Sequence, residues 1–175
     1  MKKLLLLFAI TFMLLTSAQA QFFLGGSMTA YKYPGDHGVK FTRTSFSPFL
    51  GYQHNRWSFG LGFSYIKATG IYHSLTYGRA HAWTYEPFVR YDIVQKSRFA
   101  FFTDAFFSYT RYDVKNLHYL GFSPGIRYDL SKHLIATVQL GAIGYSDDFF
   151  YGYKGLVCSL SLNTALISLY YRFAK

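Results

Sequence analysis

Hydrophobic and small polar residues alternate with a period of two along most of the chain. Between Trp57 and Tyr65, large apolar side chains occupy one phase and only Ser and Gly occupy the other. Successive side chains of a strand point to opposite faces, so this segment is predicted to be a strand with one apolar face. Seven other segments repeat the pattern, and we predict no helix. The predicted strands are residues 22–31, 42–53, 57–66, 81–92, 98–110, 117–129, 133–145 and 157–173.

The connections between these strands alternate in length. Short connections are predicted at residues 54–56, 93–97 and 130–132, and longer, more polar ones at residues 32–40, 67–80, 111–116 and 146–155. Short turns at one end and long loops at the other are typical of barrels in the bacterial outer membrane, whose short turns face the periplasm. Both ends of the chain fall on the side of the short turns.

Three prolines and one change of phase interrupt the alternation. Pro48, Pro87 and Pro124 each begin a P-x-hydrophobic-x-Tyr sequence, at intervals of 39 and 37 residues. Because proline lacks a ladder N–H, we expect these residues at bulges near strand ends. The last strand changes phase between Leu162 and Ala165, and a β-bulge near residues 163–164 would restore it.

The direction of the apolar face decides the class of barrel. A soluble sandwich or a lipid-carrying barrel also alternates, but its outer face meets water and carries many charges. Here the charges within the strands fall almost entirely in the phase of the small residues. An Arg or Lys facing lipid at the midplane costs about 2–4 kcal/mol, so the apolar phase fits lipid. We therefore predict an all-β fold, an eight-stranded antiparallel up-and-down transmembrane β-barrel.

This orientation assigns roles to charged and aromatic residues. The charges predicted to form a lumenal network are Glu86, Arg90, Asp104, Arg127 and Arg172. We interpret the network as structural, with acids and bases neutralising one another, and the alternative is a constricted ion path. Rings with one polar edge suit the membrane interface. The predicted interface aromatics are Tyr52, Trp83, Tyr91, Tyr109, Tyr128, Tyr171 and Phe173.

The N-terminus reads as an export signal. Lys2 and Lys3 precede an apolar run at residues 4–15, and Ala18 and Ala20 form an A-x-A cleavage site. The run is too short for a bilayer, which needs about 20 residues. We therefore expect residues 1–20 to be a cleaved signal peptide and residues 21–175 to be a barrel domain exported through the periplasm to the outer membrane.

The composition and net charge of the chain restrict the kinds of partner that it could bind. The chain has 175 residues, of which 51% are hydrophobic and 15% charged, which excludes a disordered protein. Its net charge of +10 favours an acidic partner, and the phosphates of lipopolysaccharide lie at the height of the long loops. The alternative is a solvated rim, and we expect no nucleic acid partner because export removes it. The candidate phosphate contacts are Lys32, Lys40, Arg43, Lys67, Arg79, Arg111, Lys115 and Lys154.

Catalytic and metal chemistry have little support in the sequence. The lone cysteine, Cys158, excludes an intramolecular disulfide. The six histidines are scattered, so we expect no metal and no cofactor. His118 precedes Ser123 and His73 adjoins Ser74, but no carboxylate completes either set at a convincing strand spacing.

Three short motifs point to a family. They are S-P-x-x-G-Y at residues 47–52, W-S-F-G-L-G-F at residues 57–63 and the closing L-Y-Y-R-F at residues 169–173. With the signal peptide and eight strands, the chain resembles the small OmpA-like, porin-family outer-membrane barrels of Gram-negative bacteria. The closing segment is similar to the C-terminal signal that the barrel-assembly machinery reads. It departs from that signal because Ala174 and Lys175 follow Phe173.

The sequence therefore leads to three functional hypotheses. The first is a monomeric outer-membrane barrel with a structural or surface-interaction role and no catalysis. The second is a narrow pore for small solutes or ions. The third is a lipid A-modifying barrel enzyme.

Overall fold

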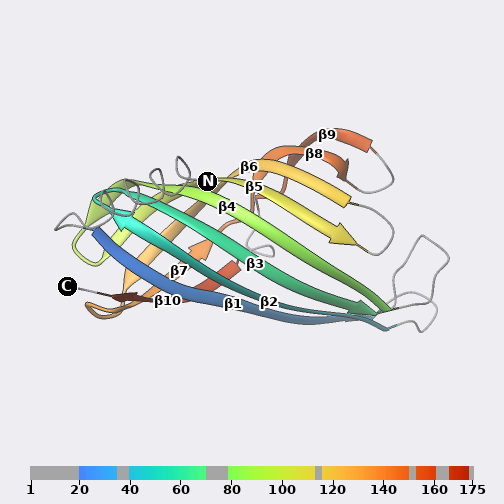
Figure 1. The fold of residues 1–175 in the computed structure, drawn as a ribbon, viewed down its shortest axis with the longest axis horizontal. Helices are drawn as coiled ribbons and strands as arrows, with labels where there is room; N and C mark the ends of the chain where they lie inside the picture. Colours follow the sequence, from blue (N-terminus) through green and yellow to red (C-terminus); the bar gives the residue numbers. More distant parts are fainter. Residues whose placement is uncertain are drawn as a thin grey trace, which may run out of the picture.

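The computed structural model describes residues 20–34, 40–69, 79–112, 116–149, 153–160 and 166–173. These residues form one antiparallel sheet that curls round on itself (Figure 1). The strands are β1 (Ala20–Pro34), β2 (Lys40–His54), β3 (Trp57–Thr69), β4 (Arg79–Lys96), β5 (Phe99–Tyr112), β6 (Asn116–Asp129), β7 (Leu134–Gln139), β8 (Ile143–Phe149), β9 (Tyr153–Cys158) and β10 (Leu166–Phe173). This described part of the chain contains no helix that is long and apolar enough to cross a membrane.

The ten segments make a closed barrel of eight strands. The chain runs up and down from β1 to β6, and β7 and β8 then pair one after the other with β6, so together they form the seventh strand. In the same way, β9 pairs with β8 and β10 with β7, forming the eighth strand. The barrel closes where β10 pairs with β1, from Phe22↔Phe173 to Gly26↔Leu169. The predicted antiparallel eight-stranded barrel is confirmed.

Two other predictions fall outside the described residues. These are the signal peptide, of which only Ala20 is described, as the first residue of β1, and the bulge near residues 163–164. Among the described residues, register shifts lie between β4 and β5, at Asp92/Val94, and between β8 and β9, at Ser146/Phe149.

The short connections are tight turns. Asn55 and Ser97 each adopt a positive φ, of 55° and 54°, in the left-handed region that lets a chain reverse within two residues. Because β4 continues to Lys96, the second turn is shorter than predicted. In the third turn, the Ser131 hydroxyl accepts hydrogen bonds from the backbone N–H groups of His133 and Leu134, at 3.2 and 2.9 Å. At the opposite end the strands run further than predicted, and β1 pairs with β2 as far as Pro34↔Lys40.

The three repeated prolines lie in the middle of strands, so the prediction of bulges near strand ends is wrong. Each proline keeps its pairing with the preceding strand, as in Gly26↔Pro48, Leu61↔Pro87 and Thr103↔Pro124. Pairing with the following strand is interrupted at the proline and at the residue before it, and on β2 and β4 it resumes in the same register. On β6 the interruption falls between β7 and β8. A missing N–H thus opens one side of the ladder, on β2 and β4 without a shift of register and on β6 with a shift of one residue.

The outer surface of the barrel is apolar, as the alternation predicts. Phe46, Trp83 and Leu120 point outward and are 58%, 55% and 60% exposed. The opposite phase is buried and largely polar, and it includes Ser27, Ser58 and Ser108. The barrel is therefore inside out compared with a soluble protein.

The lumen also contains aromatic rings, which the sequence analysis did not anticipate. Several of them lie beside a glycine on the neighbouring strand, directly opposite in the ladder. The pairs are Phe23↔Gly51, Gly60↔Phe88, Phe106↔Gly121, Phe102↔Gly125 and Gly25↔Tyr170. A Cβ built on Gly51 would lie 2.3 Å from Cζ of Phe23, so the Phe23 ring occupies the space that this Cβ would need. With Ile135, Phe23 and Tyr170 form a core inside the barrel, and Phe49 and Phe88 pack against it.

This packing predicts an asymmetry between two glycines. Gly51→Ala should destabilise the barrel by about 1–3 kcal/mol, because the new methyl group overlaps the Phe23 ring and the Phe59 carbonyl oxygen. Gly155→Ala is the matched control, since a Cβ there meets nothing within 4 Å. Urea unfolding of the refolded barrel in detergent measures both. Equal unfolding midpoints for the two variants would show that ring packing on Gly51 is unimportant.

Candidate functional site

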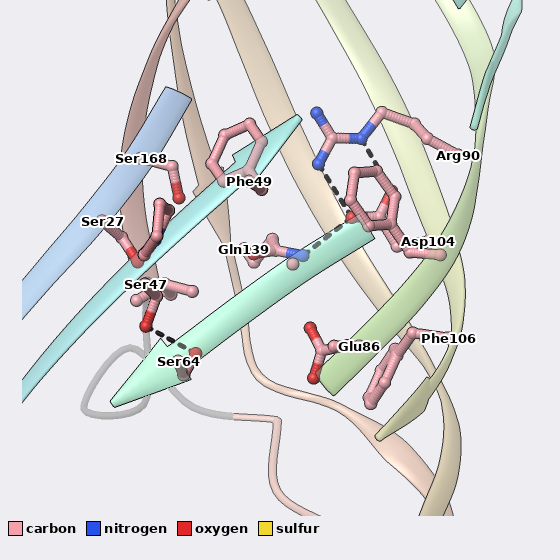
Figure 2. A pocket seen from close by; sticks show the side chains of 14 residues that line it. Ser27, Ser47, Phe49, Ser64, Glu86, Arg90, Asp104, Phe106, Gln139 and Ser168 are labelled. Carbon is pink, nitrogen blue, oxygen red and sulfur yellow. Dashed lines mark hydrogen bonds and ion pairs between the residues drawn. The ribbon is translucent and has the colours of Figure 1, made fainter. Parts of the chain in front are cut away.

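Charged residues in the lumen form two separate clusters. The first, the central cluster, consists of Arg90 on β4, Asp104 on β5 and Gln139 at the end of β7. Arg90 Nε and Nη2 donate to the two carboxylate oxygens of Asp104 at 2.7 and 2.8 Å, and Gln139 Nε2 donates to Asp104 Oδ2 at 2.8 Å (Figure 2). The guanidinium also lies over the Phe102 ring, 3.8 Å from its centroid. The bidentate geometry and the ring fix Arg90 in one position.

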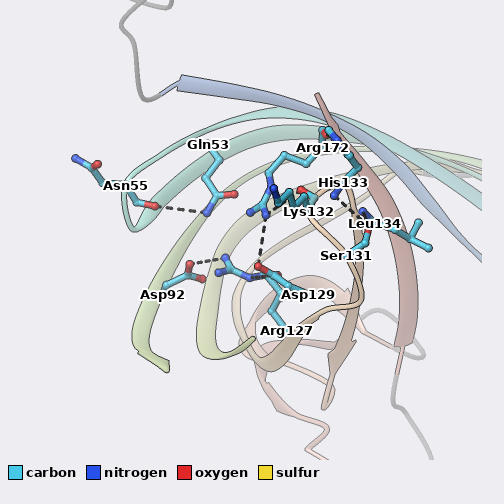
Figure 3. Close-up of polar contacts among 10 residues, drawn as sticks. All are labelled: Gln53, Asn55, Asp92, Arg127, Asp129, Ser131, Lys132, His133, Leu134 and Arg172. Carbon is cyan, nitrogen blue, oxygen red and sulfur yellow. Dashed lines mark hydrogen bonds and ion pairs between the residues drawn. The ribbon is translucent and has the colours of Figure 1, made fainter. Parts of the chain in front are cut away.

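The second, the turn-end cluster, lies at the end of the barrel with the short turns (Figure 3). Arg127 Nη1 contacts Asp92 Oδ2 at 2.5 Å, and Arg127 Nε lies 3.2 Å from Asp129 Oδ1. Arg172 Nη2 lies 3.4 Å from Asp129 Oδ2 and donates to the Lys132 carbonyl oxygen at 3.2 Å. Asp92 is 0% and Arg127 1% exposed, so these side chains fill the lumen at this level.

A cavity of about 170 Å³ lies between the central cluster and the long-loop end of the barrel (Figure 2). Its lining combines rings, such as Phe49 and Phe106, with hydroxyl groups, such as Ser47 and Ser64. The Glu86 carboxylate points into this cavity. None of the described Lys, Arg or His side chains lies within ion-pair distance of the Glu86 carboxylate. The neighbouring Arg90 forms its ion pair with Asp104 instead. The site therefore has a carboxylate without a cationic partner.

The predicted lumenal network is thus divided into three parts. Arg90 pairs with Asp104 in one cluster, Arg127 and Arg172 belong to the other, and Glu86 stands apart. The sequence analysis missed Asp92, Asp129 and Gln139, which are partners of these residues. A signal was present, because Asp92 and Asp129 continue the inward phases of Arg90 and Arg127.

The predicted interface aromatics form pairs at two levels of the outer surface. Near the short turns, the ring centroids are 4.6 Å apart in Trp57–Tyr91 and 4.5 Å apart in Phe99–Tyr128. Phe22–Tyr52 and Tyr171–Phe173 join this level, at 5.4 and 5.1 Å. Near the long loops, Tyr65–Trp83 and Tyr109–His118 are 4.7 and 5.2 Å apart.

The spacing of the two aromatic levels suits a membrane. Trp57 and Tyr65 stand on β3 at the two levels. The eight residue steps from one to the other span about 27 Å along a strand, at about 3.4 Å per step. With the strand tilt of about 40° usual in such barrels, this is roughly 20 Å along the axis, near the ~25 Å apolar band of outer-membrane barrels.

The predicted phosphate-binding residues gather at the long-loop end as far as the structure describes them. Lys67, Arg111 and Lys154 have exposed side chains there. Arg111 is paired with Trp83, and Lys67 with His81. Both therefore stand at or just beyond the aromatic level near the long loops, which is the outer aromatic level. Backbone pairing places four more bases near the ends of the long strands: Lys32, Lys40, Arg43 and Arg79. Lys115 lies outside the described residues.

One histidine has a carboxylate partner that the sequence spacing did not reveal. His118 donates its backbone N–H to Asp147 Oδ1 at 2.7 Å, and its Nδ1 lies 2.5 Å from Asp147 Oδ2. Asp147 lies 29 residues from His118 in the sequence, so strand spacing could not indicate this pair. Ser123, however, has the opposite phase and donates its hydroxyl to the Gly141 carbonyl oxygen inside the barrel. His73 and Ser74 lie outside the described residues.

The described residues offer little for metal binding or thiol chemistry. Over the described ranges, no three His, Cys, Asp or Glu residues are grouped as metal ligands would be. Cys158 is exposed at the end of β9.

Comparison with known proteins adds two solved structures. No protein-family model and no curated protein matches the chain. The in-vitro folded outer membrane protein OmpT of Vibrio cholerae is similar in its trimer form, with 9% identity, a TM-score of 0.36, and coverage of 90% of this chain and 52% of that chain. A second OmpT structure gives 12% identity, a TM-score of 0.37, and coverage of 90% and 53%. The chain spans about half the length of these proteins, and its fold rests on the strand pairing described above.

The turn-end cluster predicts a specific stability defect. Arg127→Met should destabilise the barrel by about 3–5 kcal/mol, because Asp92 is left as a buried charge without a partner. Adding Asp92→Asn should restore part of the loss, since that charge is removed. Urea unfolding in detergent measures the effect, and Arg98→Met at an exposed turn position is the control. A loss that Asp92→Asn deepens would contradict the assigned pairing.

Proposed function

We propose that this chain is an integral outer-membrane β-barrel with a structural or surface-interaction role and without catalytic activity. The observation that carries the proposal is that side chains fill the lumen near the short turns. Arg127 and Asp92 are almost completely buried in the turn-end cluster, and the rings of Phe23 and Tyr170 occupy the lumen as well. A barrel of this kind is a solid support for its outer surface and its loops.

A membrane location follows from the surface. Large apolar side chains stay exposed on strands all round the barrel, far beyond the few hundred Å² of apolar patch that a soluble monomer exposes. Lipid tolerates a spanning structure only when its backbone is paired internally, and the described strands are paired on both sides over most of the barrel wall. Short turns at one end and longer strands at the other agree with the asymmetry of outer-membrane barrels. The bilayer this surface fits best is therefore the outer membrane.

The filled lumen disfavours the narrow-pore hypothesis. An ion crossing the barrel would have to displace Arg127 and Asp92, whose charges hold each other at 2.5 Å. Removing one partner from such a buried pair is strongly unfavourable. The inward rings leave no continuous polar surface alongside, because Phe23, Ile135 and Tyr170 pack together.

Planar bilayer recording tests this part of the proposal. The purified barrel should give no steady current steps, because side chains block its axis near the short turns. Insertion is verified by reisolating the protein and comparing its gel mobility before and after boiling, because a folded barrel and the unfolded chain migrate differently. A porin added to the same bilayer provides the positive control. Reproducible current steps from verified barrels would favour the pore hypothesis instead.

Surface interaction is proposed to involve the phosphates of lipopolysaccharide. Lys67 and Arg111 are exposed at the outer aromatic level, where phosphate groups would meet the barrel wall. Cations on rigid strands beside interfacial rings can contact phosphates without ordering a loop. The Lys154 side chain adds a third exposed base on β9.

Charge reversal tests this interaction. Replacing Lys67, Arg111 and Lys154 by Glu should lower the amount of lipopolysaccharide bound per barrel several-fold, because three attractions become repulsions. The matched control reverses Lys96, Arg98 and Lys132, which are exposed at the short-turn end. Binding is measured by titrating lipopolysaccharide into barrels in nanodiscs. An equal effect of both triple variants would reduce the interaction to net charge.

The last strand provides the proposed contact with the barrel-assembly machinery. Tyr171 and Phe173 are exposed on the outer face of β10, two residues apart. The same strand closes the barrel by pairing with β1. We expect the finished protein to be a monomer, since the described strands close the sheet within one chain.

A further inference from the structure

We propose that the lumenal cavity binds a small organic monocation, an ammonium ion that carries an aromatic or short alkyl group. The site lies between the central cluster and the long-loop end. It goes beyond a structural role, because it assigns a ligand class to the interior of the barrel. Three independent features lead to it: the charge balance, the lining and the access.

The described lumenal charges do not cancel. Glu86, Asp92, Asp104 and Asp129 face three guanidinium groups, those of Arg90, Arg127 and Arg172. Each guanidinium is bound to a carboxylate other than Glu86. Glu86 remains as the unneutralised group, and its carboxylate points into open space (Figure 2). A bound cation would supply the missing charge and lower the cost of keeping this carboxylate inside the barrel.

The lining suits an ammonium ion with an apolar group. Phe49, Phe88 and Phe106 line the cavity, and ring faces attract cations. Ser47 and Ser64 lie across the cavity from Glu86, joined by a 2.7 Å hydrogen bond, and their oxygens can accept from an N–H. The volume of about 170 Å³ is near that of an engineered cavity of about 150 Å³ that binds benzene. One ring with a short aminoalkyl chain therefore fits.

The prolines explain why there is space at this level. The interrupted positions are Ser47–Pro48 on β2 and Glu86–Pro87 on β4. Ser47 and Glu86 both line the cavity. Opposite Glu86, pairing with β5 resumes only at Phe106, which is also a lining residue. The cavity thus lies where the ladder is open, with intact pairing on either side.

A way in exists on the long-loop side. A second hollow of about 220 Å³ shares Glu86, Phe106, Gln139 and Leu166 with the first and continues to Gly141, between β7 and β8. Within the described ranges, β1 pairs beyond Gly26 with β2 alone, and β9 pairs with β8 alone. Figure 1 shows the β8–β9 hairpin standing away from β1 and β2 at this end. The turn-end cluster closes the other side, so the site is a blind pocket.

Ligand titration tests the charge preference first. The full-length barrel in nanodiscs is titrated with 2-phenylethylammonium, and with 2-phenylethanol and phenylacetate as neutral and anionic counterparts of similar shape. Isothermal calorimetry, corrected with empty nanodiscs, gives the affinities. We expect saturable binding of one cation per barrel, at least tenfold weaker binding of the alcohol and none of the acid.

Variants then locate the site. Glu86→Gln keeps the shape and removes the charge, and should weaken binding of the cation at least tenfold. Asp147→Asn removes one carboxylate charge outside the cavity and should leave binding unchanged. Gly62→Leu should abolish binding by filling the cavity. A Cβ at Gly62 would meet its nearest atom at an ordinary 3.5 Å, so the barrel has room for it.

The outcomes are decisive in both directions. Gel mobility before and after boiling shows which variants fold, and the comparison of the three ligands on the natural sequence needs no variant. Cation binding lost in Glu86→Gln and Gly62→Leu but kept in Asp147→Asn supports the site. Equal binding of cation and alcohol, unchanged binding in folded Glu86→Gln, or no binding at all overturns it. None of these results depends on conductance or on lipopolysaccharide.

Discussion

The interior of this barrel depends on aromatic rings packed over glycines of the neighbouring strand. An eight-stranded barrel has a lumen only wide enough for side chains. A large ring therefore fits best where the residue opposite it is a glycine, which has no side chain. Phe23 over Gly51, on β1 and β2, and Phe102 over Gly125, on β5 and β6, satisfy this condition in two separate parts of the wall. Apolar packing is thereby obtained inside a barrel whose outer surface is also apolar, and the polar groups are confined to the remaining positions.

The packed rings determine where charges can go. The turn-end cluster lies beyond the core of Phe23, Ile135 and Tyr170, and the central cluster is held against the Phe102 ring. Each arginine is fixed by a carboxylate, which leaves nothing mobile on the axis near the short turns. The same packing that stabilises the fold therefore separates a blind cavity from the short-turn end, and links the proposed structural role to the proposed ligand site.

The prolines have a functional consequence. Because each proline interrupts pairing on one side only, the wall loosens at one level while β2 and β4 stay in register with the strands that follow them. Ser47, Glu86 and Ser123 precede the three prolines, and each lines one of the two connected hollows. A sequence repeat of about 38 residues, one hairpin long, therefore places three openings at similar heights around the lumen. The third opening, at Pro124, divides the seventh strand into β7 and β8.

The sequence by itself determined the strands, their antiparallel order and the face that carries the exposed rings, because a period of two is a local property of the backbone. It also indicated which charges face inward, including Arg90 and Arg127. Which of these charges meet was decided only by the tertiary structure, since partners such as Arg127 and Asp92 stand on strands that are not neighbours in the sheet. The rings in the lumen escaped the pattern for a related reason: Phe23 and Phe102 share the phase of small residues, and only the register shows the glycines opposite them.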